Sequence, residues 1–344
     1  KWTARTIGFD YTLPKHIMFG FPGYEAINIQ QHPAFMVPIM NKHYGCYYID
    51  QAVSTGIPQD MCTLPLVEVG VAVEDEYPDI GNCYLATNNP CDANMMRSEE
   101  HAFADGIRRF NELNIHETNK WDVYAKCDNI ALNSMAQAFW RIYMYQQGAN
   151  KHFEREAKVI WKYFEKCLKK DIRPFKYKHR ALAWSCGSPY YDSATCWLYQ
   201  CWGILTVINM DSLTGHNIVD TEDRDEMMSD IADLYARSPM RTHTVGGNRH
   251  ILMMFETAAK FNCDMIVMYD DIGCKGMAGC QGLLEEEFRK HPEFHIMWMP
   301  HALMDCRTVP TAEARKVVND YMTTVLHEEP VDPSLMDFDD SEGW

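Results

Sequence analysis

The stretch MIVMYDDIGCKG, residues 265–276, sets a continuous apolar run against two aspartates, two glycines and a cysteine. Continuous rather than alternating apolar residues are typical of a strand that is buried on both faces of a parallel sheet. Gly273 and Gly276 allow the backbone to approach a bound group closely. Cys274 therefore lies just beyond a predicted strand, in the kind of junction where α/β proteins bind their ligands.

The second half of the chain repeats this strand pattern. Apolar runs at residues 181–184, 204–208 and 294–299 predict three more strands, and a helix is expected over residues 311–326. Strands that alternate with helices indicate a parallel sheet covered on both faces. Residues 98–170 instead have apolar side chains at helical spacing, which predicts a helical connector.

The first third of the chain is predicted to form short α/β units. Asp60 is placed to cap a helix that runs from near Leu64 to near Val71. Residues 83–87 predict a strand, which enters the sequence NNPC at residues 88–91. The cysteine of this motif thus occupies a strand-to-helix turn, as Cys274 is expected to do.

Together these elements predict an α/β protein of two Rossmann-like (flavodoxin-like) parallel-sheet domains joined by a helical region. The N-terminal domain is expected over residues 1–115, the helical connector over 116–176 and the C-terminal domain over 177–330. Residues 331–344 form an acidic tail that is expected to fray. The abrupt start at Lys1 leads us to expect that a further N-terminal segment belongs to the protein.

Composition limits the classes of function. Of the 344 residues, 47% are hydrophobic and 23% are charged, which is typical of a folded globular protein. The formal net charge of −16 disfavours binding to nucleic acid or to anionic membranes. No apolar run approaches the ~20 residues that a membrane-spanning helix needs. We therefore expect a cytoplasmic protein with neither of these partners.

The thirteen cysteines lie mostly within apolar segments, which favours a reducing cytoplasm over a disulfide scaffold. The absence of any C-x-x-C motif argues against a zinc ribbon, a thioredoxin motif or a ferredoxin-type cluster motif. Any metal ligands must therefore be far apart in the sequence. Five cysteines are expected to be buried apolar residues: Cys127, Cys167, Cys196, Cys201 and Cys263.

Three cysteines stand at predicted element junctions: Cys62, Cys91 and Cys274. Backbone N–H groups at such turns and at helix N-termini stabilise anionic thiolates and sulfide. These three residues are therefore predicted to converge in the cleft between the two domains. The alternative for each is burial as a small apolar side chain, which is the more frequent role of a single cysteine. Cys46, Cys83 and Cys186 fit either role.

Several local motifs resemble the 2-hydroxyacyl-CoA dehydratase and ATP-dependent benzoyl-CoA reductase family. QDMCT at residues 59–63 is similar to the segment around the family's first cluster cysteine, and NNPC at 88–91 to the second. The strand followed by GCK at 273–275 is similar to the third. DCR at 305–307 and the strand and turn at 180–191 add to the resemblance, and the ordered set spans most of the chain.

The resemblance implies an oxygen-sensitive enzyme of two similar subunits, each holding a [4Fe–4S] cluster through three cysteines. Here these would be Cys62, Cys91 and Cys274. An ATP-dependent [4Fe–4S] activator would supply one low-potential electron to an acyl-CoA substrate. A ketyl radical then permits loss of the 2-hydroxyl group, which makes the enzyme a lyase. The partners implied are a homologous second subunit, the activator and the acyl-CoA.

Other residues receive roles by the same resemblance. Glu25 is a candidate for proton transfer, with a solvated surface carboxylate as the alternative. Asn88, Asn89 and Lys275 are expected around the cluster, where they would hydrogen-bond sulfur or substrate. Ordinary turn chemistry is the alternative for these three residues. Arg307 is expected to hold a helix–strand junction or, as the alternative, a CoA phosphate.

The sequence departs from the family pattern in three places. Gly23 follows Pro22, where family members have glutamate, and Cys306 replaces a proline. A strand–helix unit expected after Cys91 is short or missing. Two other functions therefore stay open: a subunit of a benzoyl-CoA reductase, which would be an oxidoreductase, and an electron-transfer or structural cluster subunit without its own substrate site.

Overall fold

The computed structural model describes residues 5–9, 24–28, 41–76, 83–85, 100–127, 151–173, 175–185, 194–210, 218–237 and 248–337. The strands in these ranges are β1 (Arg5–Phe9), β2 (Tyr24–Asn28), β3 (Cys83–Leu85), β4 (His179–Ser185), β5 (Ile204–Asn209), β6 (Met265–Asp271) and β7 (His295–His301). The helices are α2 (Lys42–Ser54), α3 (Thr63–Val73), α4 (Glu100–Tyr124), α6 (Lys151–Lys169), α7 (Ala194–Trp202), α8 (Arg224–Arg237), α10 (Asn248–Lys260), α11 (Lys275–Phe288) and α12 (Thr311–Asp320). A π-helical turn, η3 (Tyr321–Val325), continues α12, and a short 3-10 helix, η4 (Pro333–Leu335), follows.

The larger sheet is parallel and has the strand order β5-β4-β6-β7. All four strands predicted for the second half of the chain are confirmed, and β6 continues beyond the predicted run to Asp271. Every residue of β5 is buried, as are the first five residues of β6. Helices cover both faces of the sheet, so β5 and β6 need apolar side chains on both faces and show no alternation.

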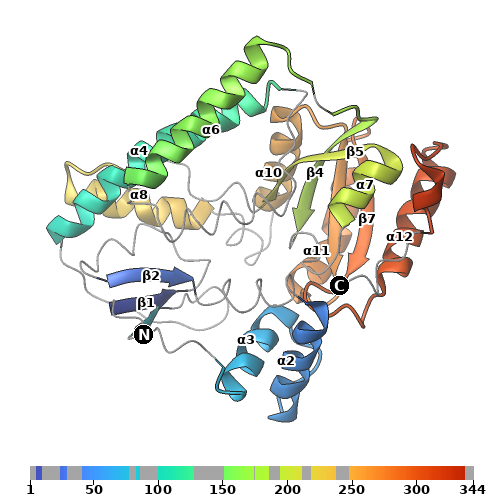
Figure 1. Cartoon of the computed structure of the whole chain (residues 1–344), viewed down its shortest axis with the longest axis horizontal. Coiled ribbons are helices and arrows are strands. Elements are labelled where there is room, and N and C mark those ends of the chain that lie inside the picture. Colours follow the sequence, from blue (N-terminus) through green and yellow to red (C-terminus); the bar gives the residue numbers. More distant parts are fainter. Residues whose placement is uncertain are drawn as a thin grey trace.

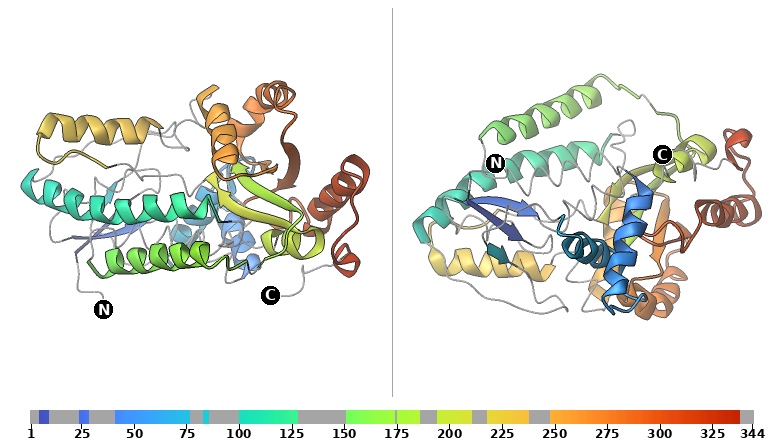
Figure 2. Two further views of the ribbon diagram at one scale, coloured as in Figure 1. Left: turned by 90° about the horizontal axis from the view of Figure 1, so that it is seen from above. Right: turned by 60° about the horizontal axis from the view of Figure 1, so that its bottom comes forward.

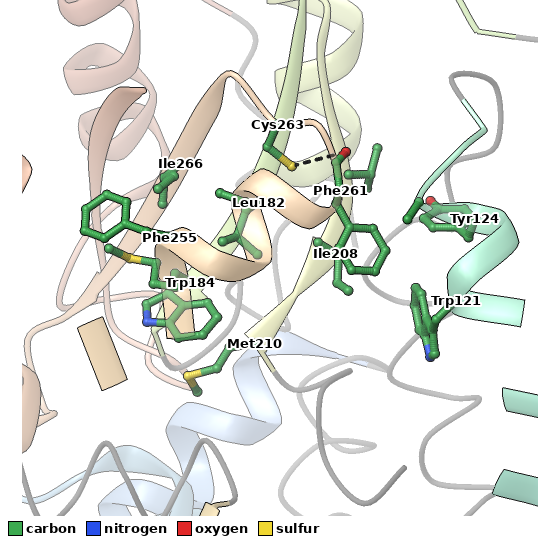
Figure 3. Close-up of a cluster of buried hydrophobic side chains, with 14 of the residues drawn as sticks. Trp121, Tyr124, Leu182, Trp184, Ile208, Met210, Phe255, Phe261, Cys263 and Ile266 are labelled. Carbon is green, nitrogen blue, oxygen red and sulfur yellow. Dashed lines mark hydrogen bonds between the residues drawn. The ribbon is translucent and has the colours of Figure 1, made fainter. Parts of the chain in front are cut away.

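Two separate hydrophobic clusters fill the layers on either side of this sheet. On one face, Leu182 and Trp184 of β4 pack with Ile266 of β6 and with Phe255 of α10 (Figure 3). On the other face, α7 and α12 cover the sheet through residues such as Trp197. The prediction of an α/β protein with a parallel sheet covered on both faces is confirmed. Its division into two Rossmann-like domains stays a prediction.

A pair of long helices occupies part of the predicted helical connector. Helices α4 and α6 run side by side (Figures 1 and 2), with His116 stacked on Trp161 at a ring-centroid distance of 5.7 Å. The C-terminal end of α4 is tied to the large sheet, because buried Arg180 of β4 donates a hydrogen bond of 2.9 Å to the Cys127 carbonyl. Residues of both helices, including Tyr124 and Phe164, also pack in the same hydrophobic cluster as Leu182 of β4.

The described part of the N-terminal third contains a small parallel sheet of order β2-β1-β3, in which Ile7 pairs with Cys83. It also contains α2 and α3, which pack closely because Gly70 of α3 lies against the backbone of Tyr48. The prediction that Asp60 caps α3 is wrong: Cys62 is the N-cap residue. A capping side chain must stand directly before the first helical residue, and Asp60 is two residues too early.

Helices α2 and α3 lie against one edge of the larger sheet. Figure 1 shows the arrowheads of β4 and β7 pointing toward the side on which α2 and α3 lie. Leu303 and Met304, which follow β7, are buried among residues of these two helices. The N-terminal helices are thus packed against the carboxyl edge, where parallel α/β sheets bind ligands.

Candidate functional site

Cys274 lies at the carboxyl edge of the larger sheet, between β6 and α11. It is the N-cap residue of α11, and its backbone N–H donates a hydrogen bond of 2.8 Å to the Asp271 carbonyl. Asp271 also accepts a hydrogen bond of 3.2 Å from the Gly273 N–H, which closes the turn between strand and helix. This geometry confirms the predicted strand–turn–helix junction and places Cys274 beside the positive end of a helix dipole.

Cys62 occupies the equivalent position at the start of α3, where it is the N-cap residue and is partly buried. The next residue, Thr63, is buried and accepts a hydrogen bond of 3.1 Å from the Met304 N–H through its Oγ1. Because Met304 follows β7, this bond attaches the start of α3 to the same sheet edge that carries Cys274. The N-termini of α3 and α11, each with a cysteine as its N-cap residue, therefore lie at the same edge of the larger sheet.

The segments that carry Cys62 and Cys274 are in direct contact. A Cβ atom added to Gly273 would lie 3.4 Å from the Cys62 Cα and 3.5 Å from the Met61 carbonyl oxygen. The Lys275 ammonium donates a hydrogen bond of 2.8 Å to Asp60, a pair 215 residues apart in the sequence. The structure thus brings together the segments that carry two of the three cysteines that we predicted to converge.

The Lys275–Asp60 pair orients the two cysteine segments relative to each other and adds little to their stability. Both side chains are more than 70% exposed, so water and salt weaken their attraction. Lys275 also lowers the pKa of Asp60 through this hydrogen bond. Lys275, predicted beside sulfur or substrate, is thus placed next to both cysteine segments while its ammonium group binds a carboxylate.

Two acidic residues at the end of β6 were not assigned a role from the sequence. Asp271 is buried, and burial raises its pKa to about 6, with the nearby Cys274 acting in the same direction. Burial also raises the pKa of Asp270. Across the β6–β7 register from Asp271, burial lowers the pKa of His301 to about 3, so this imidazole is neutral. An aspartate pair directly after a buried strand was the available sequence signal.

The remaining predicted site residues are distributed as follows. Cys91, Asn88 and Asn89 lie outside the described residues. Glu25 belongs to β2, where its backbone pairs in register with Thr6 of β1. The roles given to these four residues stay predictions.

Arg307 joins two parts of the chain. Its guanidinium binds Asp305 through Nε at 2.9 Å and Asp50 of α2 through Nη1 at 2.8 Å. This matches the predicted structural role at a junction. It places the conspicuous Asp-Cys-Arg motif at the boundary between α2 and the turn after β7.

The cysteines expected to be buried behave as predicted with one exception. Cys127, Cys167, Cys201 and Cys263 are buried, whereas Cys196 is exposed on α7. The buried residues of α7 include Ala194, Trp197 and Leu198, so the helix turns Cys196 to the opposite side. Helical spacing alone therefore contained the information needed to correct this prediction.

Two of the three predicted thiol ligands lie within the described residues. Within those ranges, no three residues among the histidines, cysteines and acidic side chains are gathered to bind a metal ion. Cys62 and Cys274 supply two thiols at one edge, each beside helix N–H groups that favour negative charge. A third ligand from the segment around Cys91 would complete the predicted triad.

The fold and this region define a class of protein: a parallel α/β protein with two cysteine-capped helix N-termini at the carboxyl edge of its sheet. The family described as 2-hydroxyglutaryl-CoA dehydratase, D-component, matches residues 97–299, and the chain belongs to this family. The match covers more than half of the chain and confirms the resemblance found in its motifs. The matched range includes Cys274 but begins after Cys62 and Cys91.

No curated protein sequence matches the chain. The family assignment identifies it as a component of a dehydratase system that acts on a CoA thioester. Within the described ranges, no helix combines the length and the apolar character that crossing a membrane requires.

Proposed function

We propose that the chain is the iron–sulfur subunit of an oxygen-sensitive 2-hydroxyacyl-CoA dehydratase. The reaction would be elimination of water from a 2-hydroxyacyl-CoA thioester through a one-electron, ketyl-radical route. One observation carries the proposal: segments far apart in the chain bring Cys62 and Cys274 to the same edge of the sheet. Membership of a dehydratase family supplies the class of substrate.

A [4Fe–4S] cluster is the cofactor that this donor set fits. Cys62, Cys274 and Cys91 would hold it, and three thiolates leave one iron of a cubane without a protein ligand. Such an iron would supply Lewis acidity toward a thioester carbonyl, and the cluster would supply one-electron redox chemistry. The contact between the α3 and α11 N-termini favours a negatively charged group there, because both helix dipoles direct their positive ends to it.

The chain's own residues would position the substrate and control protons around this site. Asp271 holds the Gly273 and Leu303 N–H groups and so fixes the turn that presents Cys274. Lys275 and Asp60 link the two cysteine segments at the surface and so orient one relative to the other. Glu25 remains our candidate for proton transfer, and Asn88 and Asn89 for hydrogen bonds to sulfur or substrate. A homologous second subunit and an ATP-dependent [4Fe–4S] activator would complete the system.

The first test is anaerobic purification of the chain followed by iron and sulfide analysis and EPR. We expect about four irons and four sulfides per chain. The variants Cys62→Ser, Cys91→Ser and Cys274→Ser should each lose the cluster or change its EPR signal. Cys196→Ser is the matched control, because this exposed cysteine on α7 should leave the iron content unchanged. Iron-free wild-type protein after attempted reconstitution would overturn the proposal.

A second test separates the dehydratase from the alternatives. The iron-loaded chain, its partner subunit and the activator are assayed with 2-hydroxyacyl-CoA and with benzoyl-CoA under anaerobic conditions. Turnover of the hydroxyacyl thioester supports the dehydratase, and reduction of the aromatic thioester instead would identify a benzoyl-CoA reductase. A cluster-loaded chain in a complete system that converts neither thioester would indicate an electron-transfer or structural subunit.

A further inference from the structure

A second pair of cysteines lies beside the site but outside the predicted triad. The Sγ atom of Cys46, on α2, is 3.6 Å from the Sγ of Cys306, in the turn after β7. The two residues are 260 positions apart in the sequence, so the fold alone brings them together. Cys46 is only 6% exposed, whereas Cys306 is partly accessible. An approach of about 1.5 Å would bring the sulfurs to disulfide length.

The charges around the pair distinguish the two thiols. A hydrogen bond from Cys46 and the charge of Lys42 lower the pKa of Cys306 to about 7, against burial and the charge of Asp305. The same hydrogen bond, together with burial, raises the pKa of Cys46. Cys306 is therefore the more acidic of the two thiols and the first to ionise, and Cys46 is the one that keeps its proton. A thiolate is the nucleophilic form of cysteine, and the more accessible residue carries it.

An acceptor for the second proton is also in place. The Asp305 carboxylate is the alternative acceptor for the Cys46 proton, because its Oδ1 lies 3.5 Å from the Cys46 Sγ. Asp305 is kept ionised, because hydrogen bonds from Arg307 outweigh the effect of burial and lower the pKa of the carboxyl group. The pair thus combines a nucleophile, a protonated second thiol and a base.

We propose that Cys306 and Cys46 form a redox-active dithiol, in which Cys306 reacts with a hydroperoxide and Cys46 resolves the product to a disulfide. The Cys306 thiolate attacks the terminal peroxide oxygen, the O–O bond breaks, and the alkoxide or hydroxide leaves and takes up a proton. This gives a sulfenic acid on Cys306. The Cys46 sulfur then attacks the Cys306 sulfur as its proton passes to Asp305, and Asp305 returns this proton to the sulfenic hydroxyl, which leaves as water. In total, two thiols lose two electrons and the hydroperoxide is reduced.

The disulfide would connect the two parts of the chain that form the candidate site. Cys46 belongs to α2, which leads into the Cys62 loop, and Cys306 follows the sheet edge that carries Cys274. Oxidation would thus clamp α2 to the turn after β7. Restoring the dithiol requires a thiol reductant.

The test treats the full chain, purified anaerobically with reduced thiols, with an equimolar amount of hydrogen peroxide. Remaining thiols are blocked with N-ethylmaleimide, and a non-reduced tryptic and chymotryptic digest is analysed by mass spectrometry. Chymotrypsin cuts after Tyr44 and Tyr47, so Cys46 is separated from every other cysteine. We expect a peptide containing Cys46 linked to one containing Cys306, and loss of this link after dithiothreitol. The readout is a disulfide, so it is independent of iron content and turnover.

Three variants assign the roles. Cys46→Ser should form no link and should accumulate a dimedone-reactive sulfenic acid on Cys306. Cys306→Ser should slow peroxide-dependent modification of Cys46 by about tenfold or more, because the thiolate is gone. Cys196→Ser, which removes an exposed thiol elsewhere, should give the wild-type yield of linked peptide. Recovery of both wild-type thiols unmodified, or a link from Cys46 to a different cysteine, would overturn the proposal.

Discussion

Arg307 neutralises the negative charge of two carboxylates, one on α2 and one in the turn after β7. It binds buried Asp305 through two nitrogens, at 2.9 and 3.0 Å, and Asp50 through a third. We expect Arg307→Ala to reduce the free energy of unfolding by about 2 kcal/mol, since it leaves Asp305 without its charged partner. Arg307→Lys should recover part of this loss, because an ammonium group lacks the planar fork. Urea unfolding at pH 7 measures both variants.

The pH dependence of this effect has a definite sign. Arg307 holds the pKa of Asp305 below its ordinary value despite burial. The stabilisation is therefore present above the ordinary carboxyl pKa of about 4 and is lost as the pH falls through the lower, folded-state pKa. The difference between wild type and Arg307→Ala should shrink toward pH 3. A difference that stays constant with pH, or a variant as stable as wild type at pH 7, would contradict this role for Arg307.

Features that depend on neighbouring residues in the sequence were predicted, whereas features that depend on contacts made in the fold were missed. Cys274 was identified because a buried strand, a glycine turn and a helix start are consecutive in the chain. Cys46 was left ambiguous because its partner, Cys306, is 260 residues away and no short motif joins them. The aspartate pair that includes Asp271 is visible in the sequence, but its burial depends on the fold. Local chemistry is therefore readable from the sequence, whereas burial and long-range pairing are not.

The packing of α2 against α3 depends on a single glycine. A Cβ atom at position 70 would collide with the Tyr48 carbonyl group, which is backbone and cannot rotate away. We expect Gly70→Ala to destabilise the protein by about 2 kcal/mol or more, because the two helices must separate. Gly279→Ala on α11 is the matched control. No described atom lies within 4 Å of its added Cβ, and it should gain about 0.5–1 kcal/mol of helix propensity. Similar thermal stability of the two variants would argue against the close approach.

A network of one histidine and two carboxylates stabilises the amino edge of the larger sheet. His179 at the start of β4 contacts Asp264 and Glu328 through its two ring nitrogens, each at 2.7 Å. Burial alone would lower the pKa of His179, but the two carboxylates outweigh it and raise that pKa. The same contacts outweigh burial in the other direction and lower the pKa of both carboxyl groups.

These shifts predict when the network stabilises the fold. The His179 contribution is present below its ordinary pKa of about 6.5 and is lost as the pH rises through the raised, folded-state value. The carboxylate contributions are lost at low pH. The cost of His179→Gln, measured by urea unfolding, should therefore be larger near pH 6 than at pH 9. An equal cost at both values would mean that the imidazole acts through packing and neutral hydrogen bonds.

At the scale of the whole molecule, the candidate site depends on contact between residues 60–62 and residues 273–275, which are far apart in the sequence. The larger sheet was predicted with accurate strand positions, since each strand is a continuous apolar run. The attachment of α2 and α3 to its carboxyl edge was not, because Leu303 and Met304 have no periodicity that identifies their partners. This attachment nevertheless sets the distance between the Cys62 and Cys274 segments.

Met304 allows the attachment to be tested against general loss of stability. Its side chain is fully buried among residues of α2 and α3, whereas the equally buried Met299 packs between the sheet and α12. Each Met→Ala change should cost about 3 kcal/mol. Only Met304→Ala should raise amide hydrogen exchange in α2 and α3 relative to β6, by about tenfold or more, because it loosens these helices locally. If Met299→Ala increases exchange in α2 and α3 to the same extent, the N-terminal helices unfold together with the sheet and the contact near Cys62 is not an independent unit.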